Sequence, residues 1–322
     1  MKLLITGGAG FIGYHLAKLF VSKNYQVDLT DVIDPVDMDG ELIALINHKN
    51  CSYFKFDLIN SNQNNIFTDD YDFIIHLAAI VGVENVLSDS YGVLLKNFLM
   101  LSKVINIAKS QIKRTKLVFT STSEVYAGSQ YHQRIKYPTT EDTILTLPDL
   151  SSPRTSYMLS KIYGEAICHA SDLDFIILRP HNIYGPRMGM KHVIPQLLKK
   201  ILLTPENGTL DVFSPNHTRT FCYVTYAAEK ILDLLEKPFN NKLVLNLGVS
   251  DEEIKIKELA KILIEVCNRK DITIKELEDT EGSPSRRVPD TSKLISSTNN
   301  TKIPSLREGI THTYNWYKEF LK

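Results

Sequence analysis

The sequence has few cysteines and no excess of charge of either sign. Four cysteines lie far apart in the 322 residues, and no Cys-x-x-Cys or Cys–His spacing of a zinc site occurs (Cys51, Cys168, Cys222 and Cys267). We therefore expect four reduced thiols and no bound metal. Basic and acidic residues number 37 each, so the formal net charge is zero. No overall field attracts the chain to nucleic acid or to an acidic membrane, and we predict neither as a partner.

Long hydrophobic runs are also missing. No apolar run is long enough for a transmembrane helix, and the start, Met1–Thr6, is too short for a signal peptide. We therefore expect a cytoplasmic protein. Hydrophobic residues make up 43% and charged residues 23%, which is ordinary for a globular protein, and the length suits about two domains.

Short apolar runs alternate with longer amphipathic stretches over the first two-thirds of the chain. We predict strands at Lys2–Ile5, Tyr25–Thr30, Tyr53–Phe56, Phe73–Leu77, Lys116–Thr120 and Phe175–Leu178, and helices at Phe11–Ser22, Leu94–Lys109 and Tyr157–Ala170. Continuous apolar strands separated by helices indicate a doubly wound α/β fold with a parallel sheet, a Rossmann fold. We expect residues 1–180 to form this NAD-binding domain. Residues 181–322 are expected to form a smaller, mainly substrate-binding lobe that shares its cleft and whose chain can cross back to the sheet.

A glycine-rich segment, Thr6–Gly13 (TGGAGFIG), lies between the first predicted strand and the first predicted helix. Gly7 permits a sharp turn, Gly10 lets the backbone approach a pyrophosphate, and Gly13 lets the helix pack closely on the strand. The free N–H groups of the helix start, at Phe11 and Ile12, would then face the phosphates. This segment predicts a dinucleotide site.

An acidic residue follows at the expected distance. Asp31 comes 18 positions after Gly13, at the end of the second predicted strand. A carboxylate there accepts hydrogen bonds from the adenosine ribose and repels a 2′-phosphate, so we predict NAD rather than NADP. Asp28 and Asp34 are alternatives within three residues.

Tyr157 and Lys161 lie four residues apart on a predicted helix and so share one face. Together with the Gly-x-x-Gly-x-x-Gly spacing, this pair resembles the extended short-chain dehydrogenase/reductase family of nucleotide-sugar epimerases, dehydratases and decarboxylases. The resemblance covers nearly the whole chain. It also rests on Asp57-Leu58, His76–Ala79, Asn97, Thr120–Tyr126, Arg179–Pro186, Arg219 and Arg287.

The resemblance implies roles for particular residues. Asp57 and Leu58 would contact the adenine, Leu77, Ala78 and Ala79 would line the path of the cofactor, and Asn97 would brace the active site and contact substrate. His76 is interpreted as a structural histidine. Tyr157 would remove a proton from a sugar hydroxyl while the 4-position is oxidised by tightly held NAD, with Lys161 favouring the phenolate and Thr122 orienting the sugar oxygen. Ser121 and Ser123 are close enough to be alternatives to Thr122.

Ser123 and Glu124 follow Thr122, where related dehydratases carry Asp-Glu. A carboxylate beside a 4-keto sugar is a candidate acid or base for the step after oxidation, so epimerisation, dehydration and decarboxylation all stay open. Release of the 4-keto product, by a dehydrogenase acting for example on a heptose, is a further alternative. A non-catalytic dinucleotide sensor is the alternative from another class.

The substrate lobe resembles the family less closely. Asn182, Arg187, Arg219 and Arg287 match positions that hold the sugar nucleotide, and arginine suits a diphosphate. Thr220 and Tyr226 replace two aspartates of the family pattern, and His181 replaces a common aromatic residue, so the sugar and its base stay open. The resemblance also implies a homodimer.

Overall fold

The computed structural model describes residues 1–61, 67, 70–237, 242–280 and 282–320. It contains two compact units, each built from separate chain segments. Unit 1 comprises Met1–Ile135, Glu141–Pro180 and Ala228–Leu245, and unit 2 comprises Lys136–Thr140, His181–Ala227 and Asn246–Lys322. Whereas the sequence analysis divides the chain once, after residue 180, the earlier segment Lys136–Thr140 here belongs to unit 2 and the later segment Ala228–Leu245 belongs to unit 1.

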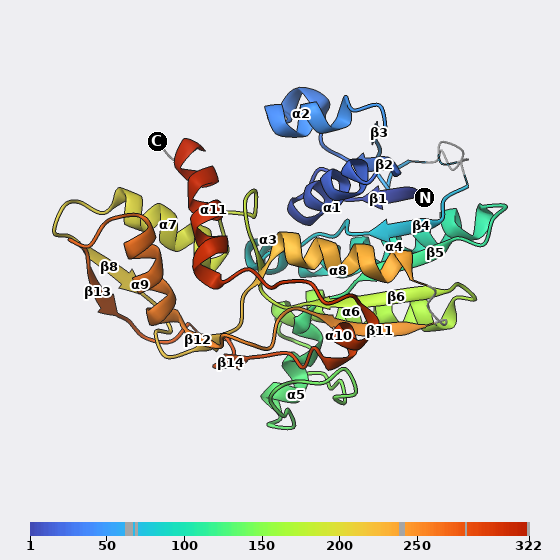
Figure 1. Ribbon diagram of the computed structural model, residues 1–322. Coiled ribbons are helices and arrows are strands. Elements are labelled where there is room, and N and C mark those ends of the chain that lie inside the picture. Colours follow the sequence, from blue (N-terminus) through green and yellow to red (C-terminus); the bar gives the residue numbers. More distant parts are fainter. Residues whose placement is uncertain (62–66, 68–69, 238–241, 281, 321–322) are drawn as a thin grey trace. The chain divides into compact units, whose positions relative to one another are not determined.

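Unit 1 is built around a seven-stranded sheet with the order β11-β6-β5-β4-β1-β2-β3 (Figure 1). Neighbouring strands from β3 to β6 are parallel. The strands are β1 (Lys2–Thr6), β2 (Gln26–Asp31), β3 (Cys51–Lys55), β4 (Phe73–His76), β5 (Lys116–Thr120), β6 (Phe175–Pro180) and β11 (Leu243–Leu247). Because the central strands are almost wholly buried, they read as continuous apolar runs. The predicted doubly wound α/β fold is confirmed.

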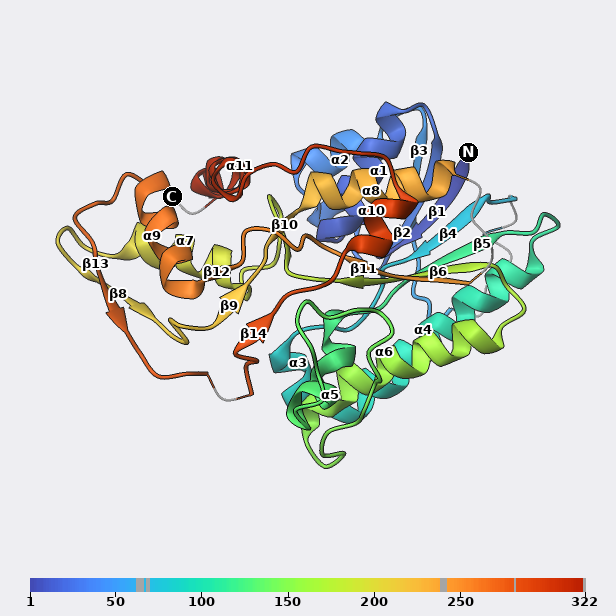
Figure 2. The same cartoon turned by 60° about the horizontal axis from the view of Figure 1, so that its bottom comes forward.

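Helices cover both faces of this sheet. Figure 2 shows α1 and α8 on one face and α4 and α6 on the other. The helices are α1 (Phe11–Ser22), η1 (Pro35–Asp37), α2 (Gly40–Ile46), α3 (Val83–Ser88), α4 (Ser90–Ser110), η2 (Ser123–Tyr126), α5 (Ala127–Tyr131), α6 (Pro153–Ala170) and α8 (Val224–Glu236), which begins in unit 2. The α4–α6 face of the sheet holds a core that includes Leu101, Val104, Phe119 and Ile177.

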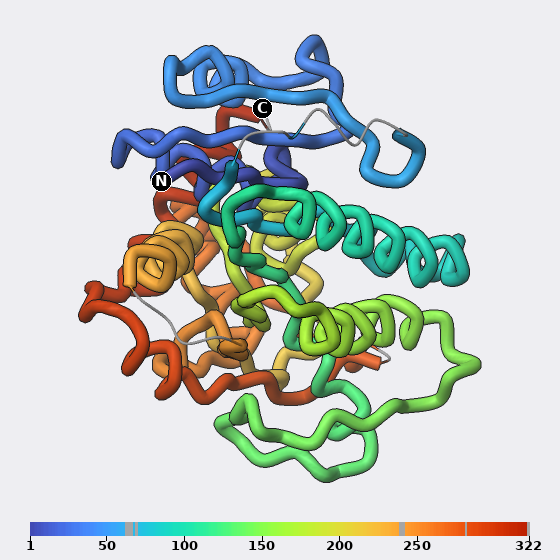
Figure 3. Tube along the Cα trace, turned by 90° about the vertical axis from the view of Figure 1, so that its right-hand side faces the viewer, coloured from blue at the N-terminus to red at the C-terminus, as the bar shows by residue number. Residues whose placement is uncertain are grey.

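Helix α4 is the one described helix that is long and apolar enough to cross a membrane by length and composition. Half of its apolar stretch is buried inside the protein. The helix packs along α6 and contacts β4 and β5, and Figure 3 shows the two helices side by side. The buried half of its apolar residues thus belongs to the core of unit 1.

The carboxyl ends of the parallel strands meet at one edge of the sheet. Strand register places Thr6 beside both Thr30 and His76. The glycine segment follows β1, Asp31 ends β2, and Thr122 follows β5 by two residues. Ligands of open α/β sheets bind at this edge, so the fold gathers the predicted cofactor residues there.

Unit 2 contains three small sheets and helices packed around α9. Strand pairs β10-β7 and β13-β8 are parallel, and β9 lies between β12 and β14. Its elements are β7 (Ile183–Tyr184), α7 (Val193–Leu203), β8 (Thr209–Val212), β9 (Thr218–Arg219), β10 (Cys222–Tyr223), β12 (Ile254–Lys255), α9 (Ile256–Val266), β13 (Thr273–Glu276), β14 (Arg286–Arg287), α10 (Ser292–Ser297) and α11 (Leu306–Phe320). Helix α9 contacts α7, α11, β8 and β13, which gives this unit its own core.

Candidate active site

The glycine segment is held tightly against the ends of β2 and β4. The N–H groups of Gly7 and Gly8 donate to the Thr30 carbonyl over 2.9 and 3.1 Å. Gly7 has a φ of +71°, and a Cβ on it would lie 2.7 Å from the amide nitrogen of Ala78. A Cβ on Gly13 would lie 2.5 Å from the Gly7 carbonyl oxygen. A side chain at Gly7 would therefore collide with the backbone after β4, and one at Gly13 would collide with the glycine segment itself. Only glycine fits at these two positions.

Helix α1 starts with its backbone donors uncovered by any capping side chain. Gly10 is the N-cap residue, and no acidic residue lies in the first turn of the described helix. Phe11 and Ile12, which the sequence analysis assigned to the cofactor, are half-buried in that turn. The exposed N–H groups and the positive end of the helix dipole suit a pyrophosphate.

Among the three candidate acids, Asp31 is the one whose carboxylate contacts the glycine segment. It accepts hydrogen bonds from the N–H of Ala9 at 3.2 Å and of Val32 at 2.8 Å. Asp28 is buried and accepts a hydrogen bond of 2.7 Å from the Tyr71 hydroxyl. Asp34 caps η1 and pairs with a lysine. Both alternatives thus already have other structural partners.

Further residues of the cofactor prediction lie in the same unit. Asp57 accepts hydrogen bonds from the backbone of Ile59 and from Asn60, which outweigh burial and keep its pKa below the usual value. Leu58 is buried in the unit 1 core. Leu77, Ala78 and Ala79 are half-buried in the loop after β4. Their contacts with adenine and ribose stay predictions.

His76 is a structural histidine, as expected. Its Nδ1 lies 2.8 Å from the Thr6 hydroxyl, and its ring stacks on Phe119. Burial, aided by the charge of Lys161, lowers its pKa to about 3, so the ring is neutral.

Two threonine hydroxyls at the carboxyl ends of strands lack partners. The Oγ1 atoms of Thr30 and Thr120 are buried and have no hydrogen-bond partner among the described residues. Polar atoms in that state are rare in folded proteins and suggest a place for a ligand or water. Together with the glycine cradle and the start of α1, they fit a bound dinucleotide.

Helix α6 carries Tyr157 and Lys161 one turn apart, and the Thr122 hydroxyl is close enough to the phenol of Tyr157 to lower its pKa. The Lys161 ammonium donates to the carbonyl oxygen of Thr120 over 2.8 Å and lies 6.0 Å from the centre of the Tyr157 ring. The Thr122 oxygen accepts from the N–H of Glu124 at 3.2 Å, which leaves its own proton for Tyr157. The structure thus brings the three predicted residues together.

Burial dominates the ionisation of this group. It raises the pKa of Tyr157 to about 12, against the effect of Thr122, and the charge of Glu124 raises it further. Burial also lowers the pKa of Lys161 to about 8, although Glu165 opposes this change. In the protein alone the phenol is therefore protonated.

The two serines beside Thr122 are both buried. Ser121 donates to Glu165, and Ser123 is buried in the first turn of η2. Glu124 is half-buried and close enough to Tyr157 to affect its pKa. Its place suits the predicted role in a second step, which stays a prediction.

Asn97, predicted as a brace of the active site, bonds two elements of unit 1. Its side chain exchanges hydrogen bonds with the backbone of Ile80, with distances of 2.7 and 3.2 Å, and donates to Ser160 at 3.2 Å. It therefore ties the loop after β4 to helix α6, between Tyr157 and Lys161. These contacts use both amide protons, while direct contact with substrate stays untested.

In unit 2, two predicted arginines lie side by side. Strands β9 and β14 pair in parallel with Arg219 opposite Arg287. Arg219 is nearly buried and donates to the carbonyls of Thr218 and Pro284 at 2.8 and 2.6 Å. Adjacent guanidinium groups of this kind suit a diphosphate.

Tyr137 lies near these arginines and was missed in the sequence. The Arg286 guanidinium lies 5.0 Å from the centre of its ring and is held by both carboxylate oxygens of Glu253 at 2.8 Å. Burial raises the pKa of Tyr137, while Arg286, Arg219 and Arg287 lower it. In the sequence, the following residue, Pro138, was the only feature that marked the position of Tyr137.

Asn182 and Arg187 both have positive φ, 42° and 71°. Asn182 donates to the Thr220 carbonyl at 2.9 Å. Thr220, which replaces an aspartate of the family pattern, is buried, and so are Tyr226 and His181. These departures thus alter the interior of unit 2.

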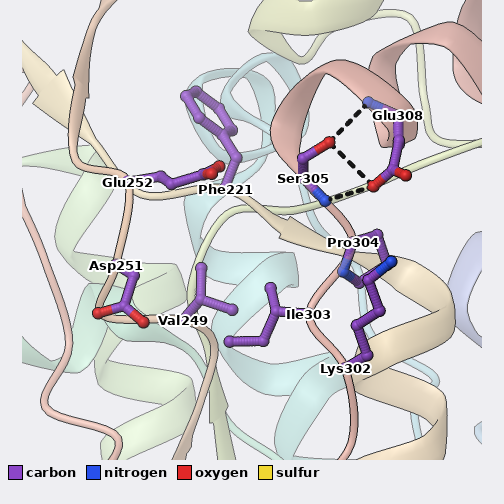
Figure 4. Close-up of a pocket in the computed structure, with 9 residues that line it drawn as sticks. All are labelled: Phe221, Val249, Asp251, Glu252, Lys302, Ile303, Pro304, Ser305 and Glu308. Atoms are coloured by element: carbon purple, nitrogen blue, oxygen red, sulfur yellow. Dashed lines mark hydrogen bonds between the residues drawn. The ribbon is translucent and has the colours of Figure 1, made fainter.

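A separate pocket of about 390 Å³ lies in unit 2 (Figure 4). Glu252 caps helix α11 by accepting from the Leu306 N–H at 3.2 Å, and Ser305 and Glu308 bond to each other reciprocally. The lining contains none of the predicted site residues (Phe221, Val249, Asp251, Glu252, Lys302, Ile303, Pro304, Ser305 and Glu308). Several of its polar groups thus stabilise the start of α11.

The fold, the glycine segment and the Tyr157–Lys161 pair are typical of dinucleotide-dependent enzymes of the Tyr-x-x-x-Lys type. The chain belongs to the NAD dependent epimerase/dehydratase family, whose sequence model matches residues 3–248. Its enzymatic class and its NAD cofactor, both expected from the sequence, are thereby confirmed.

Individual relatives match over nearly the full chain. A UDP-N-acetyl-alpha-D-glucosaminuronate decarboxylase of Bacillus cytotoxicus is 29% identical over 99% of this chain and 98% of its own length. A dTDP-D-glucose 4,6-dehydratase of Bos taurus is 27% identical over 99% and 89%. The crystal structure of a UDP-glucuronic acid 4-epimerase of Bacillus cereus with UDP-glucuronic acid and NAD is similar, with a TM-score of 0.85, 27% identity and coverage of 99% and 100%.

Proposed function

We propose that this protein oxidises the C4 hydroxyl of a nucleotide-linked sugar, with tightly bound NAD, to a 4-keto intermediate used in making glycan precursors. The observation that carries the proposal is the Thr122–Tyr157–Lys161 group on unit 1. A dinucleotide sensor would not need this group. The relatives named above act on nucleotide sugars and include a decarboxylase, a dehydratase and an epimerase.

The protein's residues would hold NAD at the sheet edge. The glycine segment and the start of α1 would bind the pyrophosphate, Asp31 the adenosine ribose, and Lys161 the nicotinamide ribose. When bound, NAD supplies a hydride acceptor and a positive charge. Tyr157 would take the proton from the 4-hydroxyl, and Thr122 would hold the sugar oxygen in place.

The nucleotide part of the substrate would bind unit 2. Arg219 and Arg287 would pair with the diphosphate, and Asn182 and Arg187 would hold the sugar nucleotide. The adjacent register of β9 and β14 supports the arginine pair.

The second step would fall to Glu124 and Ser123. A 4-ketone acidifies the C5 hydrogen and also destabilises a carboxylate on C5, so one oxidation can precede epimerisation, dehydration or decarboxylation. Decarboxylation of a uronic acid nucleotide is the second candidate. It is favoured by the glucosaminuronate decarboxylase, while the epimerase bound to UDP-glucuronic acid supports a uronic acid as the sugar.

We also propose a cytoplasmic homodimer that pairs through α4 and α6. Large apolar side chains on these helices are exposed to solvent in the described chain (Tyr91, Leu95, Leu99 and Tyr163). The four cysteines are buried and form no disulfides, which agrees with a reducing compartment. Sedimentation of Leu99→Glu, compared with an exposed site off this face, Ile112→Glu, tests the interface. A dimeric Leu99→Glu protein would contradict it.

The test of activity is mass spectrometry after incubation with UDP-, GDP-, CDP- and dTDP-sugars in heavy water. Loss of water identifies a dehydratase, loss of carbon dioxide a decarboxylase, and an isomeric product an epimerase. A product two hydrogens lighter with reduced cofactor identifies a dehydrogenase. If the Tyr157→Phe variant makes the same product at an unchanged rate, the proposal is wrong.

A further inference from the structure

A buried ion pair of unit 1 contacts the chain next to the proposed catalytic residues. Arg179, at the end of β6, donates two hydrogen bonds to Glu165 of helix α6. Its Nε lies 2.9 Å from Oε1, and its Nη2 lies 2.6 Å from Oε2. Their side chains are only 5% and 7% exposed. Removing two charges from water costs several kcal/mol per ion, and apolar residues would often be as stable in their place. The pair therefore calls for an explanation other than stability.

The pair also holds both ends of the segment that follows β5. Ser121 donates to Oε1 of Glu165 at 2.5 Å, and Nη1 of Arg179 donates to the Tyr126 hydroxyl at 2.8 Å. Thr122, Ser123 and Glu124 lie between these two attachments. The residues that would meet the sugar are thus carried on a short span fixed at either end by one buried pair.

Glu165 also belongs to the helix of the catalytic base. It lies four residues after Lys161 and eight after Tyr157, so the three side chains recur on neighbouring turns of α6. The charge of Glu165 acts on Lys161 through this proximity. One carboxylate therefore contacts the segment that carries Thr122 and shares a helix with Tyr157.

We propose that Glu165 and Arg179 are positioning residues, which hold the segment 121–126 against helix α6 so that the Thr122 hydroxyl stays beside the Tyr157 phenol. The inference rests on the proposed function only in naming Thr122 and Tyr157 as reacting groups. A displacement of about 1 Å in such groups costs on the order of a hundredfold in rate. Sequence reasoning missed this pair, because neither residue meets the substrate.

Two conservative variants detach the segment without leaving a charge unpaired. Ser121→Ala removes one bond to Glu165, whose Oε1 keeps the Arg179 Nε. Tyr126→Phe removes one bond to Arg179, whose Nη1 keeps the Glu141 carbonyl at 3.0 Å. Tyr71→Phe is the matched control, since it removes a buried hydroxyl bonded to the carboxylate of Asp28 in the same unit.

The readout needs no substrate. We would place 3-fluorotyrosine at position 157 alone and follow its fluorine resonance through a pH titration, since fluorination makes the phenol more acidic. Thr122→Val gives the effect of losing the Thr122 hydroxyl completely. We expect the Ser121→Ala/Tyr126→Phe double variant to raise the pKa of residue 157 by about one unit, a tenfold fall in acid dissociation, in the direction of Thr122→Val. Tyr71→Phe should leave it unchanged.

Two results would overturn the proposal. A double variant that titrates like the parent while Thr122→Val is shifted would show that the ion pair does not hold the segment. A shift of equal size in Tyr71→Phe would assign the effect to general loosening of unit 1. Failure of the proposed function appears separately, as turnover by Tyr157→Phe, which the fluorine titration does not measure.

Discussion

The close packing around Gly13 predicts a large effect from one added methyl group. In a Gly13→Ala variant the new Cβ would lie 2.5 Å from the Gly7 carbonyl oxygen and 2.8 Å from the Gly8 Cα. Non-bonded heavy atoms prefer about 3.5 Å or more. The obstructing atoms are backbone, so the glycine loop itself must move by about 1 Å.

Stability and binding respond differently to this shift. Overpacking costs about 1–3 kcal/mol, while replacing glycine by alanine inside a helix returns about 1 kcal/mol, so the net loss of stability is at most about 2 kcal/mol. Losing a single charge-assisted hydrogen bond to a phosphate costs about 1.5–3 kcal/mol. At about 1.4 kcal/mol per factor of ten, NAD affinity should fall about 10- to 100-fold.

Calorimetric titration of NAD into the NAD-free protein measures the affinity, and urea unfolding measures the stability. Gly40→Ala is the matched control, because nothing lies within 4 Å of its Cβ position, at the first residue of helix α2. It should bind NAD like the parent. An unchanged NAD affinity in Gly13→Ala would refute the assignment of the pyrophosphate to this loop.

Three further predictions concern single side chains. Tyr157→Phe should lower turnover about 10²- to 10⁴-fold while calorimetry shows unchanged NAD binding, and a weakened affinity for NAD would instead indicate a structural role. Asp31→Ser should reduce the preference for NAD over NADP at least about tenfold in paired titrations, since it removes a carboxylate that repels a 2′-phosphate, and an unchanged ratio would transfer the role to another acid. Lys161→Met should be more stable than the parent at pH 7, by on the order of 2 kcal/mol. Because the pKa of Lys161 falls from 10.5 to about 8 on folding, the unfolded chain binds more protons between these values. The parent therefore gains stability as pH rises through this window, and urea unfolding at pH 7 and 10 should show the advantage of the variant shrinking.

The alternating strands and helices of unit 1 could be predicted from the sequence, because their buried residues appear in it as apolar runs. The central strands are apolar throughout, and the helix Phe11–Ser22 and the strand Lys116–Thr120 have the predicted bounds. Helix α4 starts four residues before the predicted Leu94, since Asp89 caps it by accepting from the Gly92 N–H at 2.7 Å. A single aspartate in a polar stretch gave no such signal.

The seventh strand shows a different limit. Leu243–Leu247 is short and apolar, and nothing local distinguishes it from a segment of unit 2. It lies beside β6 because the chain returns to the sheet after unit 2. The hydrophobic periodicity of the sequence does not encode that return. Tyr137 was missed for the same reason, because its partner Arg286 is distant in sequence.

The pKa values of the site indicate how far the protein alone can activate Tyr157 as a base and what a ligand must add. A tyrosine four residues before a lysine suggests a phenol made acidic by a nearby ammonium, yet burial raises the pKa of Tyr157 to about 12 and lowers that of Lys161 to about 8. Desolvation therefore outweighs the attraction between the two groups in the protein alone. The remaining favourable effect is that of Thr122, which lowers the pKa of Tyr157. Since Glu124 opposes it, a further positive charge near the phenol is needed before Tyr157 can act as a base at neutral pH, and the nicotinamide of NAD carries one. Proton removal would then depend on the oxidised cofactor being present.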